Sequence, residues 1–336
     1  MRRIIGPLTA ATAVAALVVS GAGSHTFQRG LPEDTRTGEV AIFYYSWYGT
    51  EKRDGGWQHW QQHGNDPPKS IASGWMPVRG SYSSSDSAVI RDQMREIAEI
   101  GVQTVIVSWW GPTSPEAARL PTVSRAARDA GLRVALHVEP YAGRNPSQLE
   151  HEIRSFVDAG ITDFYLYDSA ATPDSEWNAL NRRLAGVRLF ANTGLPGKAL
   201  AGGFAGLYTY DVYIYDGSSF PRLCASARRL GLLCAPSVGP GYDAVRATGD
   251  PRRRSRAQGA TYDRMWRAAV RAEASIVTIT SYNEWHEGTQ IEPARTVGSP
   301  YASYDGAYGL VGPPAQRAYL DRTGMWAGQY HSRMSR

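Results

Sequence analysis

Residues 103–138 read QTVIVSWWGPTSPEAARLPTVSRAARDAGLRVALHV and contain the unit on which the fold prediction depends. Two short apolar runs, 103–109 and 132–138, flank a segment with helical spacing at 115–130, which ends at Gly131. A helix that stops at a glycine and leads after a short step into a second β-rich run is typical of a β-α-β unit. The stretch therefore predicts two parallel strands joined by a helix.

This unit recurs along the chain. Eight apolar runs are predicted as strands, and they lie at 40–47, 103–109, 132–138, 162–167, 187–192, 206–210, 231–236 and 275–281. The expected helices lie at 86–100, 115–130, 147–159, 174–185, 196–203, 218–230, 261–273 and 314–327. Strand–helix alternation repeated eight times favours an α/β fold of the (β/α)8 or TIM barrel type over an open doubly wound sheet. No GxGxxG or P-loop motif follows a strand, which removes the usual reason to prefer the open sheet.

Length and composition agree with one barrel. The chain has 336 residues and a net charge of +5 that is spread along it. Because a barrel needs roughly 250 residues, a single domain at 39–332 with insertions fits better than two domains. The charge balance gives little reason to expect a nucleic-acid partner. Most of the 10 Trp and 19 Tyr residues are expected in the core, although flat rings with polar edges also suit stacking against sugars.

The N-terminus resembles an export signal. A positive start precedes an apolar stretch at 4–19, and small residues follow up to Ala22. We therefore expect a signal peptide at 1–22, a linker or N-terminal arm at 23–38, and a secreted protein without stable membrane association. Retention as a membrane anchor is the lesser alternative, because the apolar stretch is short for a span.

Two cysteines are present, Cys224 and Cys234, on a predicted helix and the strand after it. Export would permit a disulfide between them, but two buried thiols fit the sequence equally well. The pairing therefore stays open at this point.

Polar and aromatic residues follow the predicted strands, where a (β/α)8 barrel places its chemistry. They include 47–49 (WYG), 108–111 (SWWG), 139–141 (EPY), 168–169 (DS), 208–210 (YTY) and 283–287 (NEWHE). A solvated rim would carry mainly Lys, Glu and Ser. Acids and flat rings at the same end of each strand predict a carbohydrate cleft at the C-terminal ends of the strands.

Glu284 and Glu287 are the candidates for catalysis. They lie three residues apart just past the last predicted strand, and Gly288 gives the turn freedom. Glycosidic cleavage requires one carboxylic acid to protonate the leaving oxygen and a second carboxylate to assist on the other side of the sugar. The ring of Trp285 is expected to lower the local dielectric and raise a carboxyl pKa, as a general acid requires. The alternative is that one Glu is a surface charge or a helix N-terminal residue.

Other kinds of site receive less support. The position four after His286 is Gln290, so the HExxH zinc spacing fails, and we expect no metal or other cofactor. No GxSxG elbow indicates a serine nucleophile. The basic run at 252–256 could contact phosphates, but a solvated loop, or arginines that pair with acids of the cleft, is the favoured interpretation.

Residues 281–293 (SYNEWHEGTQIEP) resemble the signature of glycoside hydrolase family 99, which comprises Golgi endo-α-1,2-mannosidases and bacterial endo-α-1,2-mannanases. The resemblance runs from about residue 40 to 295. Further matching stretches follow in the expected order: 43–49 (FYYSWYG), Gly80 with Tyr82, Ser83, Ser84 and Asp86, 107–111 (VSWWG), 139–141 (EPY) with Arg144, 167–169 (YDS), 208–210 (YTY), 238–242 (VGPGY), and Arg254 and Arg256 before Gly259.

The resemblance implies a (β/α)8 barrel that cleaves within α-mannoside chains with retention of anomeric configuration. It further implies that Glu284 deprotonates the mannose 2-hydroxyl, which attacks the anomeric carbon to give a 1,2-anhydro sugar. Glu287 would protonate the leaving oxygen and later activate water. The partner would be an α-mannan or another mannose-containing glycan, and we expect a monomer.

The resemblance also implies roles for residues around the two acids. Tyr45 and one of Tyr208 and Tyr210 would orient Glu284. Glu139 would bind sugar hydroxyls, and Trp109 would pack under the neighbouring sugar ring. The other residues expected to bind substrate are Trp47, Trp110, Tyr141, Arg144, Tyr242, Asn283, Trp285 and His286.

Two segments depart from the family pattern, 211–216 entirely and 51–66 in part. The first covers the substrate in relatives, so the linkage cleaved and the sugar beyond the cleavage point are not determined by the resemblance. Two alternatives therefore stand beside an α-mannosidase. One is a related hydrolase of another α-glycan, and the other is a non-catalytic sugar-binding barrel.

Overall fold

The computed structural model describes residues 38–335, so the predicted signal peptide and all but the last residue of the predicted linker lie outside the described residues. Eight parallel strands close into a barrel in the order β1-β10-β7-β6-β5-β4-β3-β2. They are β1 (Glu39–Tyr44), β2 (Thr104–Trp109), β3 (Arg133–Val138), β4 (Asp163–Leu166), β5 (Arg188–Asn192), β6 (Gly206–Thr209), β7 (Leu233–Val238) and β10 (Ile276–Ile279). The predicted (β/α)8 barrel is confirmed, with all eight strands in place.

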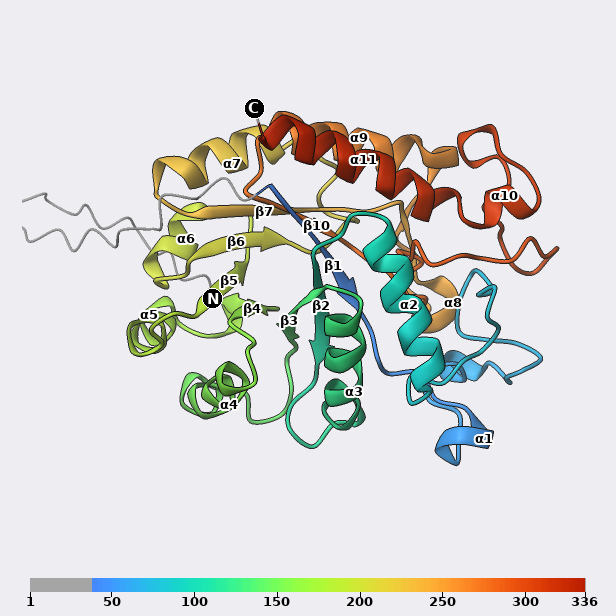
Figure 1. Ribbon diagram of the computed structural model, residues 1–336, viewed down its shortest axis with the longest axis horizontal. Helices are drawn as coiled ribbons and strands as arrows, with labels where there is room; N and C mark the ends of the chain where they lie inside the picture. The colour runs from blue at the N-terminus through green and yellow to red at the C-terminus, as the bar shows by residue number, and fades with distance from the viewer. Residues whose placement is uncertain (1–37, 336) are drawn as a thin grey trace, which may run out of the picture. The chain divides into compact units, whose positions relative to one another are not determined.

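Helices surround this barrel (Figure 1). Those that connect or follow the strands are α2 (Ser87–Glu99), α3 (Pro115–Asp129), α4 (Pro146–Asp158), α5 (Asp174–Arg183), α6 (Pro196–Ala201), α7 (Phe220–Arg229), α9 (Ala260–Arg271) and α11 (Ala318–Met334). Three of these helices begin at an N-cap side chain of the usual type. Asp86, Ser114 and Asn145 accept backbone N–H groups at the N-termini of α2, α3 and α4.

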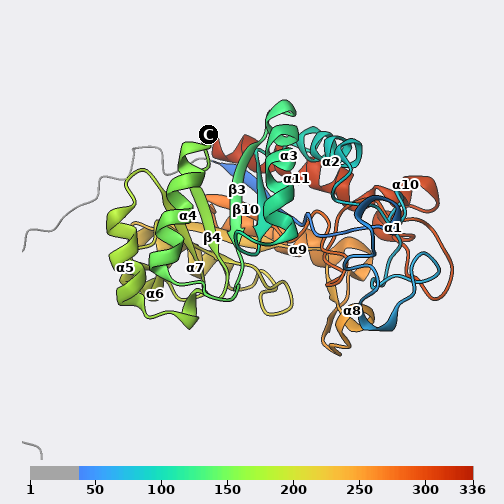
Figure 2. The same ribbon diagram turned by 90° about the horizontal axis from the view of Figure 1, so that it is seen from below.

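Short elements occupy the long loops after β1, β7 and β10. They are α1 (Glu51–Asp54), η1 (Gln62–Gly64), α8 (Val245–Thr248), η3 (Ala257–Gly259), η4 (Ala307–Gly309), α10 (Pro313–Gln316), and an antiparallel pair of β8 (Tyr242–Asp243) and β9 (Arg253–Arg254); η2 (Ser169–Ala171) lies after β4. Figure 2 shows α1, α8 and α10 gathered on the side of the barrel away from α5 and α6. These loops contact one another, because Asn65 donates to Arg246 O and Trp75 bridges to Ala302.

Several predicted boundaries differ from the structure, and three of the differences have a clear physical reason. The helix expected at 314–327 is two helices with a break at Arg317, and the second continues to Met334 because its buried stripe extends to Tyr330. β7 begins at Leu233 rather than 231, since Gly231 turns the chain with φ +68°. β1 ends at Tyr44, so residues 45–47 belong to the loop above the barrel.

Alternate strand residues fill two different cores. Rings such as Phe43, Tyr165 and Phe190 fill the barrel interior, and the last two stack with centroids 4.6 Å apart. The other strand face packs against the helices, where Trp266 of α9 and Trp326 of α11 stack with an interplanar angle of 4°. This alternation decides which strand-end residues can face the cleft.

A disulfide joins Cys224 of α7 to Cys234 of β7, which resolves the pairing left open by the sequence. Closing this loop, whose ends are 10 residues apart, removes conformational freedom from the unfolded chain. We expect reduction to lower the free energy of unfolding by about 2–4 kcal/mol. Urea unfolding with and without a reductant measures this change. A Cys224→Ala/Cys234→Ala variant is the control, and a response of that variant to reductant would contradict the assignment of the effect to this bond.

Candidate active site

The loop after β10 carries both predicted catalytic acids and closes on itself. Ser281 donates its backbone N–H to Thr289 O at 3.0 Å, and Ile291 N donates to Ser281 O at 3.0 Å. The Ser281 hydroxyl also accepts the backbone N–H of Glu284 at 2.8 Å. These contacts hold both acids at the C-terminal end of the barrel, where the fold places its chemistry.

Glu284 is buried, with 2% of its surface exposed. Its Oε1 accepts the backbone N–H of His286 at 3.0 Å. Burial, and then the nearby Glu287, raise the pKa of Glu284 well above its ordinary value. His286 offers no compensating charge, because burial lowers its pKa to about 4 and leaves the ring neutral. Since a backbone N–H can only donate, Glu284 is held as a hydrogen-bond acceptor.

Glu287 is partly exposed and lies beside two tyrosine hydroxyls. The Tyr210 hydroxyl donates to Glu287 Oε2 at 3.3 Å and lies 2.5 Å from the Tyr45 hydroxyl. Burial raises the pKa of Glu287 to about 8, and the negative charge of Asp211 is the next cause. Two carboxyl groups in one low-dielectric site do not both ionise readily, so the pair retains a proton near neutral pH. The arrangement suits Glu287 as the proton donor and Glu284 as the acceptor.

A third acid, Glu139, lies at the end of β3. It is 4% exposed and accepts a hydrogen bond from the Ser108 hydroxyl at 2.8 Å. His137, two residues earlier on the same strand face, places Nδ1 2.9 Å from Glu139 Oε1. The other ring nitrogen of His137 lies 2.8 Å from the hydroxyl of Tyr208, which is fully buried inside the barrel. Glu139 is thus fixed at the floor of the site, with Tyr208 beneath it.

Aromatic rings form one wall of the site around Trp47. The Trp47 indole is partly exposed and stacks on His59 at 4.4 Å between ring centroids, with an interplanar angle of 13°. His286 lies 5.4 Å away and Tyr45 lies 4.7 Å away. Trp110 extends the cluster at 6.4 Å. This wall suits an apolar sugar face, and it includes His59 from the loop that only partly matched the family pattern.

Several predicted substrate-binding residues lie elsewhere. Trp109 is 2% exposed and packs edge-on against Tyr141 in the layer between barrel and helices, so the expectation that it packs under a sugar is not met. The cause is strand alternation, since Ser108 points inward and its neighbour must point outward. Arg144 is partly exposed and donates to the carbonyls of Val138 and Tyr167, which ties the end of β3 to the residue after β4. Its predicted role in substrate binding stays a prediction.

Tyr141 and Tyr242 are partly exposed at the rim. The Tyr141 hydroxyl donates to Glu152 of α4 at 2.5 Å, and the Tyr242 hydroxyl donates to Asp250 at 3.0 Å. Each ring is thus anchored at its hydroxyl end by a carboxylate of a neighbouring loop or helix.

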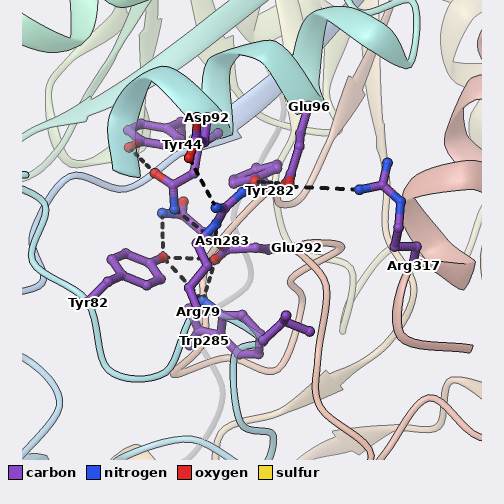
Figure 3. Close-up of polar contacts among 12 residues, drawn as sticks. Tyr44, Arg79, Tyr82, Asp92, Glu96, Tyr282, Asn283, Trp285, Glu292 and Arg317 are labelled. Atoms are coloured by element: carbon purple, nitrogen blue, oxygen red, sulfur yellow. Dashed lines mark hydrogen bonds and ion pairs between the residues drawn. The ribbon is translucent and has the colours of Figure 1, made fainter. Parts of the chain in front are cut away.

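Asn283 and Trp285 belong to a buried network centred on Glu292 (Figure 3). The Trp285 indole is fully buried and donates to Glu292 Oε2 at 2.8 Å. The prediction that this ring lines the cleft and binds substrate is therefore wrong. Asn283 accepts the backbone N–H of Tyr45 at 2.8 Å and returns a bond to Tyr45 O at 2.9 Å. These residues lock the loops after β1 and β10 together, which fixes Tyr45 relative to the catalytic pair.

The charge on Glu292 predicts a pH effect on stability. Burial raises its pKa from 4.5 to about 7, although Arg79 opposes this shift. The folded state therefore holds a proton between pH 4.5 and 7 that the unfolded state has released, so the free energy of unfolding falls as pH rises through this window. Urea unfolding across the window should show a shallower decline for Glu292→Gln than for the wild type. Parallel declines would contradict this assignment.

The basic run at 252–256 does not pair with the catalytic acids. Arg252 pairs with Asp250, and Arg253 pairs with Asp243. The guanidinium of Arg256 lies 4.6–4.8 Å from three ring centroids, those of Trp75, Tyr304 and Tyr319, and donates to the backbone oxygens of Gly288 and Gln290. Its contacts hold the outer side of the catalytic loop.

Sequence reasoning missed His59, His137, Tyr167 and Asp211. A signal existed for His137, because it precedes Glu139 by two residues on a strand and must share its face. Asp211 directly follows the 208–210 stretch, but its loop has no match to the family pattern that would assign it a role. Within residues 38–335, no group of three or more His, Cys, Asp or Glu side chains is arranged to hold a metal ion. No helix of this described part is long and apolar enough to cross a bilayer.

A closed parallel barrel with two neighbouring carboxyl groups and an aromatic wall at the strand ends is typical of a glycoside hydrolase. Comparison with known proteins gives the family. The model of glycosyl hydrolase family 99 matches residues 36–332, and the chain belongs to this family.

Relatives in this family extend over most of the chain. A glycoprotein endo-α-1,2-mannosidase-like protein of Danio rerio is 31% identical, covering 90% of this chain and 81% of its own. Glycoprotein endo-α-1,2-mannosidase of Rattus norvegicus is 28% identical, and the match covers 87% of this chain and 74% of the rat protein. A solved family 99 endo-α-mannosidase from Bacteroides thetaiotaomicron superposes with a TM-score of 0.80 at 29% identity, covering 89% and 98%. The protein is thus an endo-α-mannosidase-like glycoside hydrolase.

Proposed function

We propose that the protein cleaves internal α-1,2-mannoside bonds with retention of configuration, using Glu284 as base and Glu287 as acid/base. The observation that carries this proposal is the unequal setting of the two carboxyl groups. Glu284 accepts the backbone N–H of His286, whereas Glu287 accepts the Tyr210 hydroxyl and lies close to the charge of Asp211. Burial raises the pKa of both groups, that of Glu287 to about 8. Two neighbouring carboxyl groups with different surroundings are the usual arrangement for separate acid and base roles.

In the first step, Glu284 removes the proton of the mannose 2-hydroxyl. The oxygen attacks the anomeric carbon, and the bond to the leaving oxygen breaks as Glu287 donates its proton to that oxygen. The products are a 1,2-anhydro sugar and a shortened glycan with a free hydroxyl. An axial 2-hydroxyl trans to the leaving group permits this attack, which is the geometry of α-mannose.

In the second step, Glu287 is a carboxylate and takes a proton from water. The oxygen of this water attacks the anomeric carbon and opens the three-membered ring, while Glu284 returns its proton to the sugar O2. Two inversions at the anomeric carbon give net retention. Both side chains end in their starting protonation states, so the cycle balances.

Export of the protein is a further part of the proposal. The Cys224–Cys234 disulfide supports it, because disulfides persist in oxidising compartments. A monomer is proposed as the working unit, with one cleft per chain.

The test is mass spectrometry of products released from α-1,2-branched mannan. Oligosaccharide products, with the anomeric form retained by NMR at early times, are expected. Release of mannose alone would contradict internal cleavage, and inversion would contradict the mechanism. A panel of other α-glycans is the comparison, and turnover confined to one of them would favour the related-hydrolase alternative.

A further inference from the structure

Asp211 lies next to the catalytic acids on a loop that departs from the family pattern. It lies two residues after the end of β6 and is half-buried, and its backbone oxygen accepts N–H groups from Ile214 and Tyr215. This single turn fixes the position of the carboxyl group above the barrel end.

The Asp211 carboxylate has spare hydrogen-bonding capacity. Its contact with Tyr167 is long, since the tyrosine hydroxyl donates to Oδ1 at 3.4 Å. Among residues 38–335, no Lys, Arg or His forms an ion pair with Asp211 within 4.0 Å. A carboxylate accepts at about four lone-pair sites, so most of this capacity is free for a ligand.

The position of Asp211 is on the Glu287 side of the catalytic pair. Tyr210, the residue before it, donates to Glu287, and the Tyr167 ring lies edge-on to the Tyr210 ring at 5.5 Å. The charge of Asp211 acts on Glu287 more than any other side chain does, whereas Glu284 responds to Glu287 and Glu139. Contacts through Tyr167 and Tyr210 thus connect Asp211 to Glu287, and among residues 38–335 no hydrogen bond joins Asp211 to Glu284.

The same side has an aromatic boundary. Tyr213, two residues after Asp211, is partly exposed, with its ring 5.8 Å from that of Tyr242. The guanidinium of Arg252 lies 5.0 Å from the centre of the Tyr213 ring. A free carboxylate beside flat, half-exposed rings is a surface suited to a neutral sugar, with hydroxyl donors for the acid and an apolar face for the rings.

We infer that Asp211 and Tyr167, with Tyr213 and Tyr242 beside them, bind the sugar on the leaving-group side of the scissile bond. The inference rests on the proposed function, in which Glu287 protonates the glycosidic oxygen and the leaving sugar must therefore lie on its side. Asp211 accepts hydroxyl hydrogens of that sugar, and its negative charge disfavours a phosphorylated sugar there.

The test compares two substrates that differ only beyond the scissile bond. An α-mannotetraose with an internal α-1,2 bond fills the leaving-group side, whereas α-mannobiosyl fluoride leaves it empty. Asp211→Asn is expected to lower kcat/KM for the tetrasaccharide by about 10- to 100-fold, the effect of one hydrogen bond to a charged group. The loss on the fluoride should be clearly smaller, because the leaving-group side is empty and only the effect of the Asp211 charge on Glu287 remains.

Binding of a free sugar to the same side provides the second measurement. α-Mannobiose should inhibit fluoride hydrolysis by the wild type, and this inhibition should weaken in Asp211→Asn. Tyr167→Phe is expected to act in the same direction with a smaller effect. Asp216→Asn is the matched control, because Asp216 lies in the same loop but is engaged by Ser218.

Equal losses on both substrates, or unchanged inhibition by mannobiose, would overturn the assignment of Asp211. A wild-type protein that turns over neither substrate would instead overturn the proposed function, and the subsite with it. The wild-type rates and the variant ratios therefore report on the two proposals separately.

Discussion

Replacement of Glu284 by glutamine is expected to lower kcat by about 10²–10⁴-fold on both a sugar leaving group and fluoride. The amide cannot take the proton of the 2-hydroxyl, and that step precedes bond cleavage whatever group departs. Glutamine keeps the shape of the side chain and can still accept the His286 N–H, so the fold should persist. Initial rates on α-mannotetraose and α-mannobiosyl fluoride measure the effect.

Glu287→Gln is expected to give a different pattern. Its loss should be as large on the tetrasaccharide, which needs a proton on the leaving oxygen, and smaller on the fluoride, which departs without one. The second step still lacks its base, so some loss on fluoride remains. Glu99→Gln, at the exposed end of α2, is the control and should match the wild type. Full activity of Glu284→Gln or Glu287→Gln on the tetrasaccharide would contradict the assignment of these two residues as base and acid/base.

Gly288→Ala is expected to have the second largest effect. Gly288 has φ +64°, and an added Cβ would lie 2.6 Å from Trp75 Cζ3 and 2.9 Å from the backbone oxygen of Asp243. The preceding residue is Glu287, whose backbone oxygen accepts the N–H of Asp243 at 2.8 Å. The clash therefore displaces the acid itself, and a displacement of about 1 Å can reduce turnover by about 10²-fold.

Gly55→Ala separates the clash from the backbone conformation. Gly55 has a similar φ of +74°, but an added Cβ would meet no atom within 4 Å. The free energy of unfolding of Gly55→Ala should fall by only about 1–2 kcal/mol, the cost of the left-handed conformation, and its activity should be unchanged. Unfolding by urea and kcat/KM, measured on both variants, test this. Equal activity of the two alanine variants would show that close packing at Gly288 does not position Glu287.

Periodicity predicted the elements of this fold because their signals are local. The eight apolar runs and the glycines that end helices at Gly101, Gly131 and Gly160 each specify structure within a few residues. The helix whose extent differs most from the prediction, expected at 314–327, depends on packing of Tyr330 against distant residues. One of these is Ala274, whose carbonyl accepts the Tyr330 hydroxyl hydrogen.

The motif around Glu284 and Glu287 likewise identified the catalytic loop, since it is contiguous. Prediction failed where the direction of a side chain was needed. Trp109 and Trp285 stood beside the right residues in the sequence, but strand alternation and the Glu292 network turned both indoles into the core. Adjacent residues on an extended chain point in opposite directions, so nearness in sequence to a functional residue does not place a ring in the cleft.

The sequence by itself determined the barrel, the family and the position of two acids after the last strand. Tertiary structure alone decided their electrostatic setting, because burial and the approach of Asp211 from the loop after β6 raise the pKa of Glu287. It also decided the pairing of Cys224 with Cys234. The physical reason is the same in each case: desolvation, charge proximity and bond formation depend on distances through space that local sequence patterns do not specify.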